Sequence, residues 1–167
     1  MNMAAKEILQ GMIECGIEVA ASVPCVNLSA LLTNLDASPI RHIAVSREEE
    51  GVGLCAGAYL GGAKSALIMQ NSGLGNSINA LASLDLLYGI PLLMIMSHRG
   101  VENESVCAQI PMGKLTIPLL NDLAIPYIEL EAGGDGLHTI EDAWRLAEER
   151  QRPSAVLIKP SYWRGDR

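Results

Sequence analysis

The segment SALIMQNSGLGNSINALASLDLLYGIPLLMIMS, residues 65–97, contains the pattern that decides the fold. It begins with an apolar run over 65–70 and ends with a second over 91–97, and each has the length and composition of a buried strand. Between them, apolar side chains recur at helical spacing over 76–88. Two buried strands joined through a helix form a crossover connection, which makes them parallel. The segment therefore predicts one strand–helix–strand unit of a parallel sheet.

The same alternation continues along the rest of the chain. Further strands are predicted at 17–22, 41–46, 126–130 and 154–160, and further helices at 3–15, 27–36, 48–61, 114–123 and 139–151. Strict alternation predicts a three-layer α/β fold, with a mostly parallel six-stranded sheet covered by helices on both faces. No linker or repeat divides the sequence, so residues 1–167 are expected to form a single domain. Functional loops are then expected at the carboxyl ends of the strands, near Ser22, Ser46, Gln70 and Ser97.

Composition and charge restrict the classes of function. Hydrophobic residues make up 49% of the 167 residues and charged residues 19%, which indicates a globular chain and favours a surface partly covered by another subunit. A net charge of -7, without any Lys- or Arg-rich run, argues against nucleic acid and against an anionic membrane as partners. The N-terminal segment lacks the features of a secretory signal, and no apolar run is long enough to span a bilayer. A soluble, cytoplasmic protein is expected.

The four cysteines are far apart in the sequence. Cys15, Cys25, Cys55 and Cys107 include no C-x-x-C pair. This spacing suits reduced thiols of a cytosolic chain better than a disulfide framework or a zinc site. No metal site is expected in this chain.

Three consecutive glutamates begin the helix predicted at 48–61, within VSREEEGVGLCAG at 45–57. Ser46 and Glu49 have the spacing of a capping box, and an exposed Glu50 would be favoured by the helix dipole. Neither explanation accounts for Glu48. The glycines that follow, between 51 and 62, lower helix propensity by roughly 1 kcal/mol each in the helix interior. They indicate close approach of another backbone or of a flat ligand.

The segment QNSGLGNSINAL, residues 70–81, follows a predicted strand and opens a helix. It lacks the lysine of a phosphate-binding P-loop and the third glycine of a dinucleotide fingerprint. A glycine-containing turn that exposes its backbone to a planar ring remains an alternative, because Gly73 and Gly75 carry no side chain that would block such contact.

A polar loop, MSHRGVENESVCAQIPMG at 96–113, follows the predicted strand at 91–97. His98 and Arg99 could together hold an anionic group, because a guanidinium binds such groups through two parallel hydrogen bonds. The alternative is a surface turn with a solvated arginine.

Taken in order, four segments carry a resemblance: REEEGVGLCAGAYLGG, LIMQNSGLGNSINALASL, IPLLMIMSHRG and AQIPMG. The chain resembles the pyrimidine-binding half of the thiamine diphosphate-dependent 2-oxoacid decarboxylases over nearly its whole length. Within that family it is most similar to the branch that decarboxylates sulfopyruvate, and the phosphonopyruvate decarboxylases share the same motifs. The resemblance implies thiamine diphosphate as cofactor, a 2-oxoacid as small-molecule substrate, and the pyrimidine-binding type of α/β fold.

Residue roles follow from the same resemblance. Glu48 matches the glutamate that bonds N1′ of the cofactor's aminopyrimidine, where a shared proton helps the ring to remove the proton from thiazolium C2. The matched cofactor-binding residues are Asn71, Ser72, Gly73, Leu74 and Gly75. The matched substrate-binding residues are Pro24, Cys25, His98, Arg99 and Gln109. Many relatives carry an acidic residue near the position of Cys25, so the group that protonates the product stays open.

Relatives of full length carry a second domain, in which a G-D-G strand end and later asparagines bind Mg2+ and the diphosphate. The GDG at 134–136 precedes no asparagine and is assigned to a turn. The resemblance therefore implies a partner beta subunit that holds Mg2+ and the diphosphate, and a hetero-oligomer of alpha and beta chains. A half-enzyme for phosphonopyruvate or another 2-oxoacid, and a non-catalytic interaction domain, are the alternatives.

Overall fold

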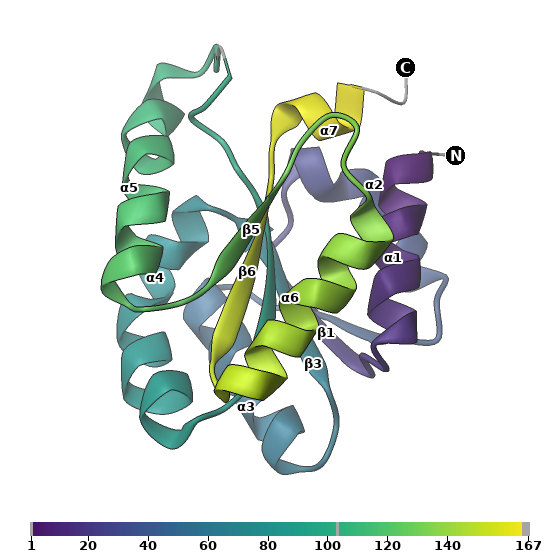
Figure 1. Ribbon diagram of the computed structural model, residues 1–167, viewed down its shortest axis with the longest axis vertical. Helices are drawn as coiled ribbons and strands as arrows, with labels where there is room; N and C mark the ends of the chain where they lie inside the picture. The colour runs from purple at the N-terminus through teal and green to yellow at the C-terminus, as the bar shows by residue number, and fades with distance from the viewer. Residues whose placement is uncertain (1, 103, 165–167) are drawn as a thin grey trace.

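The computed structural model describes residues 2–102 and 104–164. Six strands form one sheet in which every adjacent pair is parallel, in the order β2-β1-β3-β4-β6-β5 (Figure 1). The strands are β1 (Val19–Ser22), β2 (Arg41–Ala44), β3 (Ser65–Gln70), β4 (Leu92–Ser97), β5 (Tyr127–Leu130) and β6 (Pro153–Ile158). The predicted α/β fold is confirmed, and all six predicted strands are present.

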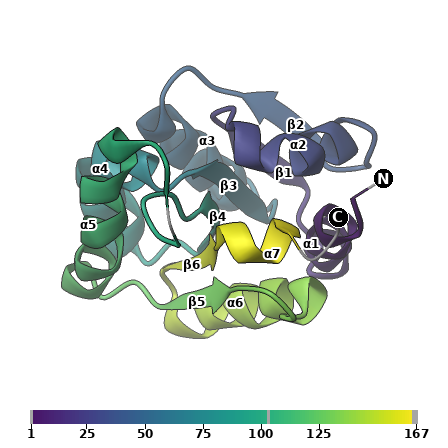
Figure 2. The ribbon, with the colours of Figure 1, turned by 90° about the horizontal axis from the view of Figure 1, so that it is seen from above.

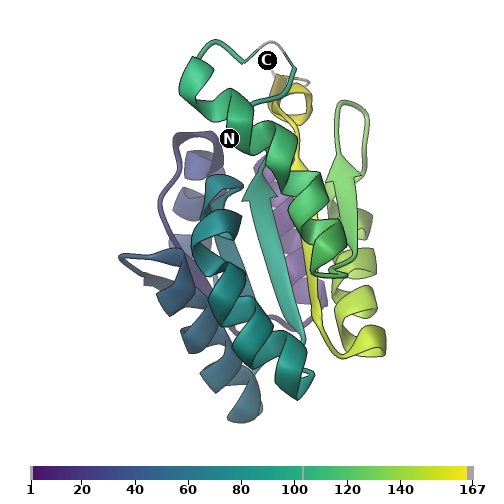
Figure 3. The same ribbon diagram turned by 90° about the vertical axis from the view of Figure 1, so that its left-hand side faces the viewer.

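Helices cover both faces of this sheet. They are α1 (Met3–Glu14), α2 (Ser29–Asp36), α3 (Glu48–Leu60), α4 (Ser72–Ala80), α5 (Ile110–Asp122), α6 (Gly136–Arg150) and α7 (Pro160–Arg164). One hydrophobic cluster joins α1, α2 and α6 to one face of the sheet, and a second joins α3, α4 and α5 to the other. Figure 2 shows these two layers on either side of the sheet, and Figure 3 shows α4 and α5 crossing in front of it. The three central strands β3, β4 and β6 are buried along nearly their whole length because both faces are covered.

Several helices begin earlier than predicted, and for α6 the reason is a side chain that caps it at an unexpected position. Helix α6 begins at Gly136, three residues before the predicted start, since the side chain of Asp135 accepts a hydrogen bond from the His138 backbone N–H at 3.0 Å. The GDG assigned to a turn is therefore the N-terminus of this helix. Helix α5 likewise begins at Ile110 rather than at 114, with Pro111 in its first turn. The short helix α7 was not predicted.

Helix α3 begins at Glu48 as predicted, but its cap differs from the prediction. The carboxylate of Glu50, not that of Glu49, reaches back to the backbone N–H groups of Ser46 and Arg47, at 3.0 and 3.3 Å. Glu49 instead pairs with the guanidinium of Arg47. Glu49 and Glu50 thus have structural roles at the surface, and only Glu48 is buried.

The register of the sheet aligns the carboxyl ends of the central strands. Gln70 at the end of β3 lies opposite Ser97 at the end of β4, and Ser97 lies opposite Ile158 at the end of β6. The side chains that follow these strands are therefore brought to one edge, at the top of Figure 1, where α7 also lies. No helix among the described residues is long and apolar enough to cross a membrane.

A buried carboxyl group lies on the α4 side of the sheet. Helix α4 continues into a π-helical turn, Leu81–Leu86, and Asp85 in this turn is fully buried. Neither of its carboxyl oxygens has a hydrogen-bond partner among the described residues. Burial raises the pKa of this carboxyl group to about 7 because the charged form loses its hydration.

This raised pKa predicts a dependence of stability on pH. In the native state Asp85 holds its proton up to pH values near 7, whereas the unfolded chain releases it near pH 4. The native state thus binds more protons between these values, so stability falls as pH rises through this window. The full shift corresponds to a penalty of about 4 kcal/mol at pH 8. Asp85→Asn should reduce the loss of unfolding free energy between pH 5 and pH 8, measured by urea denaturation. The exposed Asp122→Asn is the control, and an equal pH dependence in both variants would contradict this account.

Candidate functional site

Glu48 is the buried acid at the start of α3, and it faces α4. Its side chain is 8% exposed, and its Oε2 accepts a hydrogen bond from Asn76 Nδ2 at 2.8 Å. Gly73 lies directly against it: a Cβ on this residue would be 2.5 Å from Cγ and 2.8 Å from Cδ of Glu48. Any larger residue at position 73 would therefore displace the carboxyl group. This close approach, between the glutamate and the helix that follows β3, is a different one from that predicted for the glycines of α3.

The glycines of α3 serve two different purposes. Gly51 faces the sheet, where a Cβ would lie 2.5 Å from Leu67 Cδ1, so glycine is needed for packing within the chain. A Cβ at Gly53 or Gly57 would meet nothing within 4 Å, and both residues are exposed. The predicted close approach of another backbone is thus not made inside this chain at Gly53 and Gly57.

Residues 71–75 were predicted to form a turn, but α4 already begins at Ser72. The predicted start at 76 followed the apolar spacing; in the structure Gly73 and Gly75 lie inside the helix despite their low propensity, and Gly73 packs against Glu48. Within this segment Leu74 is fully buried in the core, Ser72 is half-buried and Gly75 is exposed. A flat ligand could therefore contact the helix surface at residues 72 and 75, but not the buried Gly73 and Leu74.

Asn71 joins the ends of β3 and β4. Its Nδ2 donates to the carbonyl of Arg99 at 3.0 Å and to Thr116 Oγ1 at 2.9 Å, and its Oδ1 accepts from the backbone N–H of Arg99 at 3.1 Å. The side chain is fully buried. Its amide is thereby committed to positioning the loop after β4, and this role was not predicted.

A cluster of polar side chains lies where β1, β3 and β4 end. Gln70 Nε2 donates to Gln109 Oε1 and to Ser72 Oγ, each at 2.8 Å. The thiol of Cys25 lies 3.2 Å from Ser97 Oγ and 3.9 Å from Gln70 Oε1. The structure thus brings the predicted residues Cys25 and Gln109 together through Gln70 and Ser97, which were predicted only as the strand ends where functional loops begin. Pro24, which precedes this cluster, is exposed.

His98 does not contribute the positive charge that was expected of it. The residue is 2% exposed, and its Nε2 lies 3.4 Å from the carbonyl oxygen of Gly113 on α5. Burial lowers the pKa of the imidazole below its ordinary value, and the bond to Gly113 only partly opposes this shift. The neutral form of the ring therefore predominates at pH 7. The composition of the loop gave no sign of this burial.

Arg99 is held by an acidic side chain of its own loop. Its Nε and Nη2 donate to the two carboxylate oxygens of Glu104, the Nη2 bond being 2.8 Å long. Both side chains are shielded, at 15% exposure for Arg99 and 7% for Glu104. The hydrogen bonds from Arg99 lower the pKa of Glu104 to about 2, so the pair stays ionised. The predicted guanidinium is at the expected edge of the sheet, but one of its two donor edges is already occupied.

No group of three or more His, Cys, Asp or Glu side chains within 2–102 and 104–164 is arranged to hold a metal ion. Cys15, Cys25, Cys55 and Cys107 are all free thiols. The chemistry of the site therefore rests on one buried carboxyl group, a hydrogen-bonded thiol and amide cluster, and one ion-paired guanidinium.

Comparisons with known proteins agree with this geometry. The family model described as the N-terminal TPP binding domain of thiamine pyrophosphate enzymes matches residues 2–121. In fold, the chain is similar to a solved 2-oxoglutarate:ferredoxin oxidoreductase from Magnetococcus marinus, with a TM-score of 0.72 and 19% identity over 95% of this chain and 29% of that one. The chain belongs to the thiamine pyrophosphate enzymes, as a domain of the N-terminal type.

Relatives define its family more closely. Sulfopyruvate decarboxylase subunit alpha of Methanococcus maripaludis is 47% identical over 98% of this chain and 99% of its own length. A sulfopyruvate decarboxylase of Methanosarcina acetivorans is 37% identical, over 95% of this chain and 40% of its own length. A phosphonopyruvate decarboxylase of Streptomyces viridochromogenes is 33% identical, over 93% of this chain and 40% of its own. Within the thiamine pyrophosphate enzymes, the chain belongs to the family of sulfopyruvate decarboxylase alpha subunits.

The residues present fit the cofactor of this family. An aminopyrimidine ring needs a carboxyl group that is sheltered from water and fixed in orientation, and Glu48 meets both needs through its burial and its bond to Asn76. Gly73 leaves the space that this carboxyl group occupies. Neither Asn76 nor Gln70 was found from the sequence, since no short motif links them to Glu48.

The contact between Gly73 and Glu48 yields a direct prediction. Gly73→Ala should lower the free energy of unfolding by no more than about 3 kcal/mol, because the helix propensity of alanine offsets part of the steric clash with Glu48. It should lower decarboxylase activity at least tenfold in the enzyme assembled with its second subunit, because the added methyl group displaces the Glu48 carboxyl group. Gly53→Ala measures the helix-propensity effect alone in the same unfolding assay. Full activity of Gly73→Ala would show that the position of Glu48 is not critical.

Proposed function

We propose that this chain is the alpha subunit of a cytoplasmic, thiamine diphosphate-dependent decarboxylase that converts 3-sulfopyruvate to sulfoacetaldehyde and carbon dioxide. The observation that carries the proposal is the buried Glu48 carboxyl group, fixed by Asn76 against Gly73. Relatives with the name sulfopyruvate decarboxylase subunit alpha match nearly the whole chain at 42–47% identity, whereas the phosphonopyruvate decarboxylases are 33–36% identical. This difference favours a sulfonated substrate over a phosphonate.

Glu48 acts on the pyrimidine ring in this proposal. Its carboxyl group shares a proton with N1′, and Asn76 keeps Oε2 in a fixed orientation so that little reorganisation is needed. When bound, thiamine diphosphate supplies a thiazolium ring that accepts the electron pair left as carbon dioxide departs. The segment 71–75 would hold the pyrimidine through its accessible residues Ser72 and Gly75, while the side chain of Asn71 holds the loop after β4 in place.

The substrate lies beside the polar cluster formed by Cys25, Gln70, Ser97 and Gln109. These side chains are at the carboxyl ends of β1, β3 and β4, where parallel sheets bind their ligands. The amide of Gln109 and the thiol of Cys25 can each donate a hydrogen bond to a carboxylate or keto oxygen. The neutral imidazole of His98 has a positioning role through Gly113 instead of an electrostatic one.

A partner beta subunit completes the active site by holding Mg2+ and the diphosphate. The relative from Methanosarcina acetivorans matches this chain over only 40% of its own length, so it carries a large additional part, which we assign to the partner here. Three apolar side chains are 67–73% exposed on the α3 and α4 side: Leu60, Leu87 and Tyr88. Together with the exposed Gly53 and Gly57 of α3, they offer an apolar surface for a second chain. The enzyme is thus a hetero-oligomer.

The alternative of a non-catalytic domain is disfavoured, because such a domain would have no need of a buried carboxyl group at Glu48.

Reconstitution tests the proposal. The chain alone should bind thiamine diphosphate weakly in calorimetric titrations with Mg2+ and show no turnover. Co-produced with its beta subunit, it should decarboxylate sulfopyruvate with a kcat/KM at least tenfold higher than for phosphonopyruvate, or about 1.4 kcal/mol. Tight cofactor binding with turnover by the lone chain would contradict the two-subunit account. A preference for phosphonopyruvate would contradict the substrate.

A further inference from the structure

We infer that a small hollow beside the polar cluster is the subsite for the distal sulfonate of the substrate, with Arg164 and Asn27 as recognition residues. The hollow has a volume of about 230 Å³ and is lined by Arg99 and Arg164 together with Asn27, Glu102, Glu104 and Pro160, among others. Two guanidinium groups thus face one space. The inference rests on the proposed function, because it assigns a part of that substrate to a part of this chain.

The first guanidinium has donors to offer. Arg99 uses Nε and Nη2 for Glu104, whose carboxylate also accepts from the backbone N–H groups of Gly100 at 3.3 Å and Val106 at 3.0 Å. Within the part of the chain that the structure describes, Nη1 of Arg99 has no protein acceptor. Glu104 therefore fixes the direction of the guanidinium and leaves its other edge for a ligand.

The second guanidinium is held in the same way. Nη2 of Arg164 donates to Glu102 at 3.1 Å, and Glu102 also accepts from the backbone N–H and the hydroxyl of Ser161, each at 2.8 Å. Glu102 adopts a φ of 50°, a left-handed conformation that is unfavourable for this residue type. The three hydrogen bonds offset that cost and hold the loop after β4 against α7. Arg164, whose side chain is 55% exposed, thereby lines the hollow from α7.

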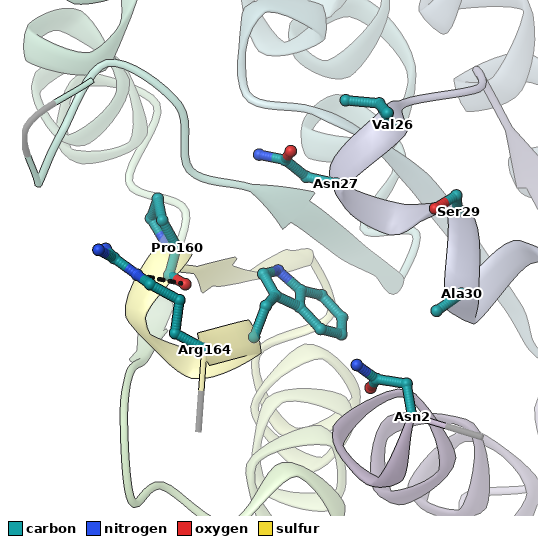
Figure 4. A pocket seen from close by; sticks show the side chains of 8 residues that line it. Asn2, Val26, Asn27, Ser29, Ala30, Pro160 and Arg164 are labelled. Carbon is teal, nitrogen blue, oxygen red and sulfur yellow. Dashed lines mark hydrogen bonds between the residues drawn. The ribbon is translucent and has the colours of Figure 1, made fainter. Parts of the chain in front are cut away.

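Asn27 contributes a neutral donor from a third segment. It lies two residues after Cys25, and its side-chain amide makes no hydrogen bond among the described residues. Asn27, Pro160 and Arg164 also line a larger neighbouring hollow of about 410 Å³, and Figure 4 shows Asn27 and Arg164 on its opposite sides. Asn27 and Arg99 each follow a member of the polar cluster by two residues, Cys25 and Ser97, so the hollow lies near the cluster although no side chain of the cluster lines it. One ligand could reach both places.

The chemistry of the hollow suits a sulfonate. Its two arginines are balanced by two glutamates, so it carries little net charge, but the carboxylate oxygens are already bonded while donor groups remain. A sulfonate is a weak base with three oxygens, and it is bound well by several directed N–H groups. A chain with a net charge of -7 must supply such donors locally to bind a dianion.

Substrate kinetics of the assembled enzyme test the subsite. Arg164→Gln should raise KM for sulfopyruvate at least tenfold, with kcat changed less than threefold, because the contact is made with the non-reacting end of the substrate. The inhibition constant of 3-sulfopropanoate should rise by a similar factor, whereas affinity for thiamine diphosphate should not change. Asn27→Ala should shift the same two constants in the same direction. Arg145→Gln is the matched control, since Arg145 is an exposed arginine paired with Asp142 on α6.

Three results would overturn the inference, and they are distinguishable. If the unmodified enzyme turns over sulfopyruvate while Arg164→Gln and Asn27→Ala match Arg145→Gln in KM and in inhibition, the sulfonate binds elsewhere. If the unmodified enzyme does not turn over sulfopyruvate, the proposed function fails and the subsite fails with it. A loss of kcat and cofactor affinity without a rise in the inhibition constant would show that Arg164 has only a structural role.

Discussion

The contact of the Glu48 side chain with the backbone of Gly73 is the constraint on which the site depends. It places a carboxyl group between the first turns of α3 and α4, two helices that start at the same edge of the sheet. Asn76 on α4 then bonds Oε2 of this group, so one helix supplies the acid and the next supplies both the space and the orientation. Burial of a carboxylate is costly unless it is hydrogen-bonded. The arrangement therefore needs glycine at position 73, to leave space, and a hydrogen-bond donor at position 76.

Carboxylates elsewhere at this edge hold cations and backbone groups in place. Glu104 and Glu102 fix Arg99 and Arg164, and Glu50 caps α3. Part of the negative charge of this acidic chain is thus used to fix two arginines, which line the same hollow. Asp85 is different, because its carboxyl group has no partner among the described residues and its burial disfavours the ion. Asp85 therefore affects the stability of the fold through its own protonation state.

The sequence pattern was sufficient for the fold, and it singled out Glu48, which is buried, but not the residues around it. The limits of β3 were predicted at 65–70 and are observed there, because buried strands of this length leave a clear apolar run. Helix α4 was predicted four residues late, since the prediction followed the apolar spacing, which contains no information on Glu48. The bonds that build the site join residues 28 or 39 positions apart, as from Asn76 to Glu48 and from Gln70 to Gln109. Such contacts arise only from the strand order, so no local motif could reveal them, and burial of His98 was hidden for the same reason.

The central claim, that Glu48 activates the cofactor through N1′, is tested most directly by the rate at which bound thiamine diphosphate exchanges its C2 proton for deuterium. This rate can be measured by proton NMR after acid quench, in the assembled enzyme and without substrate. The account predicts that exchange is much faster in the unmodified enzyme than in free cofactor, and that Glu48→Gln lowers it at least a hundredfold while Glu50→Gln leaves it unchanged, since glutamine also suits the capping position. Equal exchange rates in Glu48→Gln and the unmodified enzyme would contradict it.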